Sequence, residues 1–386
     1  MRMTQLKTIA DIQTGPFGSQ LHKEDYVETG TPIVTVEHLG NRVFTEQNLP
    51  RVSDSDKARL IKYTLSTGDI VFSRVGSVDR CSYVDKSHDG WMFSGRCLRV
   101  RPTELVDSLY LYYYFCLEET KQFVRNIAVG ATMPSINTKL LGEVEIALPD
   151  LNNQKRIAAV LSSLDDKIEN NQKLNDNLQQ QAAALFSSLY DRSNTEVRFT
   201  DLIQILGGGT PKTGENTYWN GNIAFFTPKD VGTPYTLITE KTISKEGLSH
   251  CNSRLYPVNT VFVTARGTVG KVGMSGVPMA MNQSCYALVG KETHQLLVYF
   301  YTLKAVDRLK HKASGAVFDA ITTRDFESEQ IMKLSDDDAT AFLRVAEPMF
   351  QEVLNNNIEN LRLSTLRDSL LPKLMSGEID VSAVQL

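Results

Sequence analysis

The pattern of apolar and polar positions changes in character along the chain, and it does so twice in the same order. Residues 1–150 and 193–335 mix short β-branched and aromatic runs with Gly, Pro and Asp, which is typical of strands and turns. Each stretch is followed by a long segment in which apolar residues recur at alternating spacings of three and four, which predicts a heptad helix. The sequence therefore predicts a duplicated fold, with a mixed domain before a long helix each time.

Shorter elements are expected within the two mixed stretches. Strands are predicted at residues 32–36, 69–73, 97–101, 223–227 and 260–264. Helices are predicted at residues 105–125 and 292–312, and residues 142–149 predict an extended exit toward the first long helix. The tyrosines of the first short helix are expected in the core; a platform for stacked bases is the alternative, which their spacing does not favour.

The first long helix is predicted at residues 152–192, which contain neither Gly nor Pro. At 1.5 Å of rise per residue, about 41 residues would reach roughly 60 Å, which exceeds an ordinary globular helix and indicates a coiled coil. The expected seam consists of Ile168, Asn171, Asn175, Leu178, Ala182, Leu185 and Leu189.

The second long helix is predicted from residue 336 onward. Its seam matches the first and consists of Val353, Asn356, Asn360, Leu363, Arg367, Leu370 and Leu374. Because each helix alone would expose its seam, we expect the two to pack together, with the second running back antiparallel to the first. The asparagines of both seams are expected to fix the register; that they face solvent is the alternative.

The predicted fold class is α+β, with two similar mixed α/β domains separated by two long antiparallel coiled-coil helices related by an approximate two-fold axis. The expected boundaries are 1–150 for the first domain, 151–192 for the central helix, 193–335 for the second domain, 336–377 for the C-terminal helix and 378–386 for a tail. The best letter matches between the halves join residues 68–78 to 258–269, with Phe72 beside Phe262, and residues 129–132 to 314–317.

Composition narrows the class of protein. The chain has 386 residues, 41% of them hydrophobic, and a net charge of −4, so it is no simple basic coat for nucleic acid, although local basic surfaces stay possible. Its five cysteines are scattered without a paired spacing, which favours free thiols in a reducing compartment. The sequence has no apolar run long enough to span a bilayer and no signal-peptide core, so we expect a soluble cytoplasmic protein without a membrane partner.

Catalytic motifs are not evident. Residues 209–214 have the glycine spacing of a phosphate-binding loop, but Glu215 and Asn216 follow where Lys and Ser or Thr are required. The six histidines are isolated, and the chain has no metalloprotease motif and no nucleophile elbow. The sequence therefore predicts no catalytic site, no metal site and no bound cofactor.

Basic and polar residues gather at matching places in the two halves. Arg and Lys contact guanine and phosphate, while Asn and Gln contact adenine, so these segments are candidates for nucleic-acid binding. A solvated basic face is the alternative for any single residue. The candidate residues are Ser73, Arg74, Ser77, Arg80, Arg96 and Arg99 in the first half, and Thr264, Arg266, Thr268, Lys271, Asn282 and Gln283 in the second.

Three segments resemble a known family. Gly208-Gly209-Thr210-Pro211, with residues 218–231, is similar to the opening of a target-recognition domain; residues 148–158 resemble the junction into a central helix, and residues 366–379 a C-terminal signature. Together they resemble the specificity (S) subunit of type I restriction–modification systems over essentially the whole chain. The second junction, at residues 333–339, departs from the pattern because it lacks the counterparts of Pro149 and Gln154.

The resemblance implies a non-catalytic DNA-binding subunit. The two domains would each read half of a split, asymmetric sequence in double-stranded DNA through the major groove. The helices would set the gap and dock two DNA adenine methyltransferase (M) subunits, with Ile168, Asn171, Leu178, Leu185, Val353, Asn356, Leu363 and Leu370 as the expected coiled-coil positions. S-adenosylmethionine, ATP and Mg would belong to the M subunits and to the motor–nuclease (R) subunits. A coiled-coil structural adaptor whose end domains bind proteins is the alternative.

Overall fold

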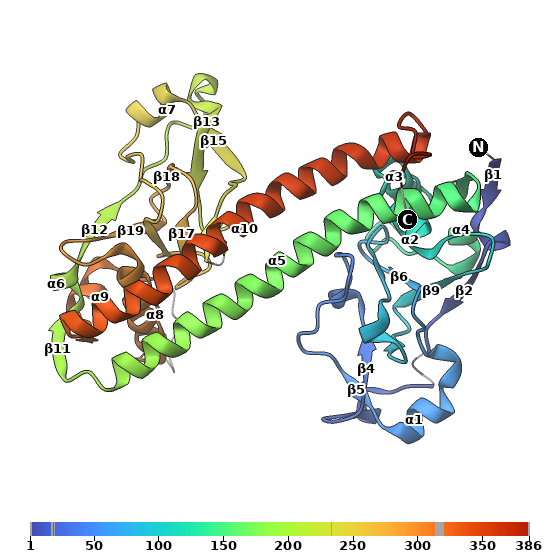
Figure 1. The fold of residues 1–386 in the computed structure, drawn as a ribbon, viewed down its shortest axis with the longest axis horizontal. Helices are drawn as coiled ribbons and strands as arrows, with labels where there is room; N and C mark the ends of the chain where they lie inside the picture. Colours follow the sequence, from blue (N-terminus) through green and yellow to red (C-terminus); the bar gives the residue numbers. More distant parts are fainter. Residues whose placement is uncertain (1, 17, 19, 233, 313–319, 385–386) are drawn as a thin grey trace. The chain divides into compact units, whose positions relative to one another are not determined.

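A computed structural model describes residues 2–16, 18, 20–232, 234–312 and 320–384, and its contacts divide the chain into two compact units (Figure 1). The first unit comprises Met1–Ile168 and Arg362–Leu386, and the second comprises Glu169–Leu361. Each unit therefore contains one mixed domain and one end of both long helices. The division of the chain into five sequential segments stays a prediction.

The first unit is built around a four-stranded antiparallel sheet with a core on either face. Its strands, in spatial order, are β2 (Ala10–Thr14), β9 (Cys97–Pro102), β6 (Ile70–Ser73) and β7 (Cys81–Tyr83). Ile70 and Phe72 point into a core shared with helix α2 (Ser108–Cys116), where the Phe72 and Phe115 rings lie 4.7 Å apart. Val71 points the other way, because strand side chains alternate between faces. That second core is shared with the sheet formed by β3 (Tyr26–Val27), β5 (Arg51–Val52), β4 (Thr31–Val34) and β8 (Met92–Phe93).

The second unit repeats this plan. Its main sheet runs β12 (Ile203–Gly207), β19 (Cys285–Gly290), β16 (Val261–Thr264), β17 (Val272–Ser275) and β14 (Tyr235–Thr236). Its smaller sheet runs β15 (Lys241–Ile243), β13 (Trp219–Phe226) and β18 (Met279–Met281). Val261 and Val263 point into the core shared with helix α8 (Gln295–Lys312), and Phe262 points into the core on the other face.

This alternation corrects the letter match between the halves by one residue. The pattern of hydrogen bonds and burial pairs Phe72 with Val263, whereas the sequence comparison set Phe72 beside Phe262. Gly68 and Asn259 confirm the corrected register, because both have positive φ (96° and 68°). A shift of one residue would exchange the two faces of the strand. The other letter match, of residues 129–132 with 314–317, lies outside the described residues.

Both long helices are present, and each follows a two-stranded ribbon. β1 (Arg2–Gln5) pairs with β10 (Glu145–Leu148), which leads into α5 (Leu151–Asp191); β11 (Thr195–Arg198) pairs with β20 (Gln330–Lys333), which leads into α10 (Asp336–Ser376). Each long helix has 41 residues. Despite the unusual second junction, both starts are capped, since Asp150 accepts from the Asn153 amide at 3.0 Å and Ser335 from the Asp338 amide at 3.1 Å.

The two helices pack antiparallel, which confirms that part of the predicted fold. In the second unit the side-chain Nδ2 of Asn171 donates to Asn360 Oδ1 at 2.9 Å, and Nδ2 of Asn356 donates to Asn175 Oδ1 at 2.9 Å. Asn171, Asn175 and Asn356 are buried, so the alternative that they face solvent is wrong. The later residue of α5 in these two pairs meets the earlier residue of α10, so the helices run in opposite directions, and α5 (green) and α10 (red) lie side by side in Figure 1. Leu178 and Leu185 pack against the core, although Phe186 is buried more deeply than its neighbour Leu185.

One predicted helix needs correction. The helix expected over 105–125 is two helices, α2 and α3 (Glu118–Ile127), separated at Leu117. Its tyrosines are core residues as expected, because Tyr110, Tyr112 and Tyr113 are buried. In the segment after α10, Val381 is buried in the core of the first unit.

The remaining elements are short. The α-helices are α1 (Asp54–Arg59), α4 (Thr138–Gly142), α6 (Phe199–Leu202), α7 (Lys245–Ser249) and α9 (Thr323–Ser328). The 3-10 helices are η1 (Leu6–Thr8), η2 (Lys23–Asp25), η3 (Val36–His38), η4 (Ile61–Tyr63), η5 (Lys86–His88) and η6 (Asn216–Tyr218). Of the helices in the described part of the chain, none combines the length and apolar character that a membrane span needs.

Candidate nucleic-acid interface

Four loops meet at one end of the mixed domain in the first unit, and we call this group the first loop end. It consists of the segments 15–16, 35–38, 74–80 and 94–96, which follow β2, β4, β6 and β8. The Ser94 amide donates to the Val34 carbonyl at 2.9 Å, and the Arg74 amide donates to the Arg96 carbonyl at 2.8 Å. Backbone hydrogen bonds therefore hold the tips of three different loops against one another.

The second unit contains an equivalent group, the second loop end, at segments 208–211, 227–230, 265–271 and 282–284. The Asn282 amide donates to the Phe226 carbonyl at 3.0 Å, and the Ala265 amide donates to the Ser284 carbonyl at 2.8 Å. These two bonds reproduce the two described for the first loop end, between equivalent strand ends. The duplication thus extends to the backbone framework of the candidate site.

One glycine in each loop end permits a close approach of two loops. A Cβ atom on Gly15 would lie 2.1 Å from the Ser94 carbonyl oxygen, and one on Gly208 would lie 2.3 Å from the Asn282 carbonyl oxygen. Real Cβ atoms do not come so near, so a side chain at either position would push the loops apart. Gly208, directly before the segment with the glycine spacing of a phosphate loop, therefore has a packing role.

Cationic side chains project from both loop ends. Arg80, Arg96, Arg266 and Lys271 are exposed, and none of them forms an ion pair with any residue that the structure describes. Arg74 in the first loop end is half-buried, and its guanidinium donates to the Gly95 carbonyl at 3.1 Å. Such exposed cations without acidic partners are suited to phosphate oxygens or to guanine.

An open hollow of about 590 Å³ lies at the first loop end. Residues from all four of its loops line the hollow, among them Pro16, Glu37, Arg74 and Arg96. His38 at its wall is buried, and its Nδ1 accepts the Thr35 amide at 3.0 Å, which fixes the turn after β4. The hollow thus has a hydrogen-bonded turn in its wall and two arginines in its lining.

Two of the candidate residues hold the loops instead of projecting from them. Ser73 is buried and its hydroxyl donates to the Val75 carbonyl at 2.8 Å. Thr264 is equally buried; its hydroxyl donates to the Thr268 carbonyl and accepts the Lys271 amide at 2.9 Å. We therefore correct the expectation that Ser73 and Thr264 contact nucleic acid, because neither hydroxyl is accessible.

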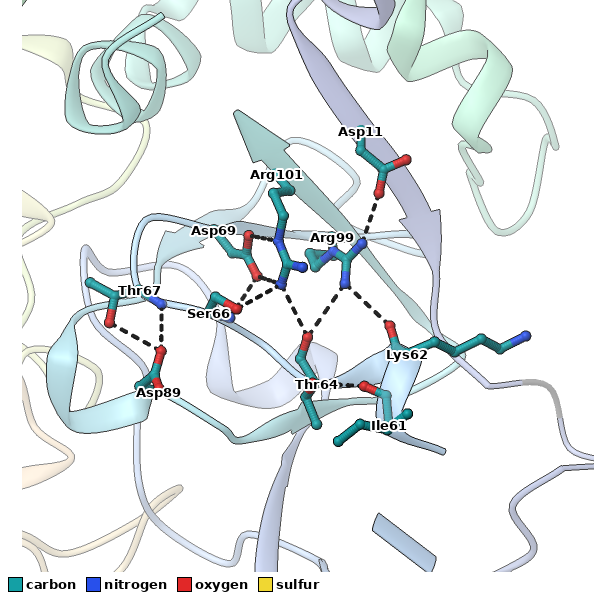
Figure 2. Close-up of polar contacts among 10 residues, drawn as sticks. All are labelled: Asp11, Ile61, Lys62, Thr64, Ser66, Thr67, Asp69, Asp89, Arg99 and Arg101. Carbon is teal, nitrogen blue, oxygen red and sulfur yellow. Dashed lines mark hydrogen bonds and ion pairs between the residues drawn. The ribbon is translucent and has the colours of Figure 1, made fainter. Parts of the chain in front are cut away.

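Arg99 is a third correction (Figure 2). It is only 4% exposed, and its guanidinium forms an ion pair with Asp11 at 2.8 Å and donates to the carbonyls of Lys62 and Thr64. Beside it, Arg101 binds both carboxylate oxygens of buried Asp69 at 2.7 Å, and this hydrogen bond raises the pKa of Arg101. Both arginines thus tie β9 to the segment around η4, and they stabilise the domain.

The remaining candidates lie at the loop ends. Ser77 and Thr268 are exposed, with the Thr268 hydroxyl donating to the Pro228 carbonyl at 3.1 Å. Asn282 is half-buried, and its side-chain oxygen accepts the Ser284 amide at 3.0 Å. Gln283 is exposed, and its side-chain oxygen accepts the Thr210 hydroxyl at 2.5 Å. The candidate set missed Thr210, although it belongs to the Gly208–Pro211 motif that carries part of the family resemblance.

Each loop end has a buried cysteine at its base, Cys97 on β9 and Cys285 on β19. Burial raises the pKa of each thiol to about 12, so both stay protonated and are not nucleophiles. Among the described residues there is no group of three or more His, Cys, Asp or Glu side chains that could hold a metal ion.

The duplicated domain, with an equivalent loop end in each copy and a long helix after each copy, places the chain in the class of internally repeated proteins with a long helix after each repeat. Comparison with known families identifies it further. The family model of the type I restriction modification DNA specificity domain matches residues 1–180 and again residues 192–333, so the chain belongs to this family. The resemblance found in the sequence is confirmed.

Individual relatives agree with this assignment. The chain is 24% identical over 404 residues to the type I restriction enzyme HindI specificity subunit of Haemophilus influenzae, covering 82% of this chain and 88% of that protein. It is 25% identical over 307 residues to the MjaIX specificity subunit of Methanocaldococcus jannaschii, covering 72% and 71%. The crystal structure of a type I system S subunit from M. genitalium shares the fold, with a TM-score of 0.63 at 16% identity over 97% of this chain and 95% of that one.

Proposed function

We propose that this chain is the non-catalytic DNA-reading subunit of a type I restriction–modification complex. Each domain reads one half of a bipartite, asymmetric site in double-stranded DNA, and the long helices hold the two halves apart while they dock M and R subunits. The observation that carries the proposal is the pair of loop ends, which share one backbone framework and expose cations without acidic partners in the described chain. Membership of the specificity-domain family supports it.

The two loop ends also differ, which supports an asymmetric target. The first exposes Arg80 and Arg96, whereas the second exposes Lys271, Arg266 and Gln283. Side chains with different donors and acceptors contact different base edges, so equivalent frameworks would read unlike half-sites. Catalysis, S-adenosylmethionine, ATP and Mg are assigned to the partner subunits under the same proposal.

Exchange of one domain tests the modular reading. Residues 1–150 are replaced by the first domain of another family member, and the assembled complex with its methyltransferase subunits is used to select duplexes from a random pool. We expect one half of the selected sequence to change and the other half, with the gap, to stay as in the parent. A change in both halves would contradict the assignment of one half-site to each domain.

The same assay separates the proposal from the adaptor alternative. A coiled-coil adaptor with protein-binding end domains would assemble with its partners yet show equal affinity for selected and scrambled duplexes. A DNA-reading subunit should prefer its site by about three orders of magnitude or more at physiological salt. Assembly with its partners but without a preference for the selected duplex would therefore contradict the proposed function.

A further inference from the structure

The tips of the loops after β8 and β18 occupy equivalent positions but carry different side chains. The first tip is Ser94-Gly95-Arg96 and the second is Asn282-Gln283-Ser284. Their equivalence follows from shared backbone bonds: each tip begins with an amide bound to the preceding parallel strand and ends with a carbonyl bound to the loop after β6 or β16. Differences between the tips are therefore differences in chemistry on a common scaffold.

Arg96 is the polar side chain of the first tip. It is exposed at the hollow, next to Arg74, whose own guanidinium is turned back to the Gly95 carbonyl. A guanidinium offers donors and no acceptor, so on a base edge it matches two adjacent acceptors. In the major groove those are O6 and N7 of guanine.

Gln283 is the polar side chain of the second tip. Its side-chain oxygen accepts the Thr210 hydroxyl, which orients the amide. Thr210 is held in turn, because the preceding Gly209 amide donates to the Met281 carbonyl at 3.1 Å. The amide nitrogen and the second lone pair of the oxygen stay available, and this donor–acceptor pair matches N7 and N6 of adenine.

Asn282 and Ser284 are less suited to the same contact. The side-chain oxygen of Asn282 accepts the Ser284 amide inside the tip, and the Asn282 side chain is half-buried. Ser284 is also half-buried, and its carbonyl is bound by Ala265. Gln283 is thus the exposed, oriented group of this tip.

We propose that Arg96 reads a guanine in the half-site of the first domain, and that Gln283, positioned by Thr210, reads an adenine in the half-site of the second. This inference rests on the proposed function and specifies it at the level of single bases. Thr210 is a positioning residue, because it acts through Gln283 and needs no contact with DNA.

The test uses the complex of the full chain with its methyltransferase subunits and a pool of duplexes with randomised bases. Arg96→Gln should lower the preference for guanine at one position of one half-site by about 10- to 100-fold, with the other half unchanged. Gln283→Arg should convert a preference for adenine into one for guanine at one position of the other half. Thr210→Ala should weaken that adenine preference, and Thr210→Ser should restore it because the hydroxyl donor is kept.

Matched controls come from exposed residues of the same type on β-strands outside the loop ends. Arg2→Gln on β1 and Gln204→Arg on β12 should leave the selected sequence unchanged. A weakening by Arg96→Gln that is equal for all bases, with a smaller salt slope, would identify a phosphate contact and overturn the assignment of Arg96. If the parent complex selects no bipartite sequence at all, the proposed function fails, which is a separate outcome.

A second measurement changes the base instead of relying on a side-chain variant alone. Replacing the guanine by 7-deazaguanine removes the N7 acceptor and should weaken binding of the parent complex by about 10-fold. The same replacement should have little further effect on an Arg96→Ala complex, because alanine has no donor for N7. Equal losses in both complexes would show that Arg96 does not contact this base.

Discussion

Equivalent places in the two units are filled in opposite ways. In the first unit Tyr113 on α2, Asp165 on α5 and Arg367 on α10 form a polar network. Phe300, Phe350 and Ala182 take the corresponding positions of α8, α10 and α5 in the second unit. Asp165 and Phe350 lie equally far from the first residue of their helices, as do Arg367 and Ala182. The duplicated backbone therefore accepts a charged or an aromatic solution at the same point.

The polar network of the first unit is held by short hydrogen bonds. Arg367 binds Asp165 at 2.6 Å, and the Tyr113 hydroxyl donates to the other carboxylate oxygen at 2.7 Å. Burial works against the charge on Arg367, but hydrogen bonding to Asp165 and the charge of Asp165 outweigh it, so the pKa of Arg367 is raised. Burial, with the charge of Asp165, also raises the pKa of Tyr113. The network therefore keeps Tyr113 protonated as a donor and Arg367 charged.

The aromatic solution depends on packing. Phe300 and Phe350 meet edge to face with ring centroids 5.5 Å apart, and Phe186 stacks on Phe300 at 4.9 Å. All three rings and Ala182 are buried in the core of the second unit. Such a cluster tolerates loss of atoms gradually, whereas a buried ion pair that loses one partner leaves an unpaired charge.

The largest expected effect comes from breaking the charged network on one side only. Arg367→Leu should lower the free energy of unfolding of the first unit by about 3 kcal/mol, the lower end of the range for buried ion pairs, because the Arg367 side chain is 30% exposed. Urea unfolding of the full chain followed by circular dichroism measures it. Arg362→Leu, at an exposed position of the same helix, is the control; an effect no larger than that of the control would show that the pair contributes little.

A smaller effect is expected in the aromatic cluster of the second unit. Phe350→Leu keeps an apolar side chain and should cost about 1–2 kcal/mol, because neighbouring rings lose contacts but no charge is left unpaired. Val345→Ala, on the exposed side of the same helix, should cost less. A loss from Phe350→Leu as large as that from Arg367→Leu would erase the proposed difference between the two solutions.

The sequence predicted the two long helices and their seams, but not which side chains form the buried polar network. The seam spacing of three and four is local, and it correctly included Ala182, Arg367 and the asparagines. Continued by one step before Ile168, the alternation reaches Leu164, whereas the buried residue is its neighbour Asp165. A lone aspartate looks solvent-exposed until its partner, far away in the sequence, is known. Arg99 was misassigned for the same reason, because Asp11 and the carbonyls that bind it come from distant segments.

The register of the repeat was off by one residue for a different reason. The dipeptide Val71-Phe72 looks like Val261-Phe262, and similarity of letters favoured that match. Hydrogen bonds of the flanking loops, and the alternation of side chains between two cores, require Phe72 to match Val263. The sequence shows which residues are apolar, whereas the hydrogen-bond pairing between strands decides on which face of the sheet they lie.

The smallest effect is expected when the aromatic solution is moved into the first unit. The triple variant Tyr113→Phe, Asp165→Phe and Arg367→Ala removes the carboxylate, its cation and the hydroxyl together, so no buried charge is left unpaired. Arg367→Ala removes side-chain volume, and Ile157 and Leu371 are smaller than Phe342 and Phe186 at the equivalent helix positions, so we expect the added ring to fit. We expect unfolding within about 1 kcal/mol of the parent, or a modest gain, as measured in the same urea experiment. A loss matching that of Arg367→Leu alone would mean that the charged network is required by the first unit, and the two solutions would not be equivalent.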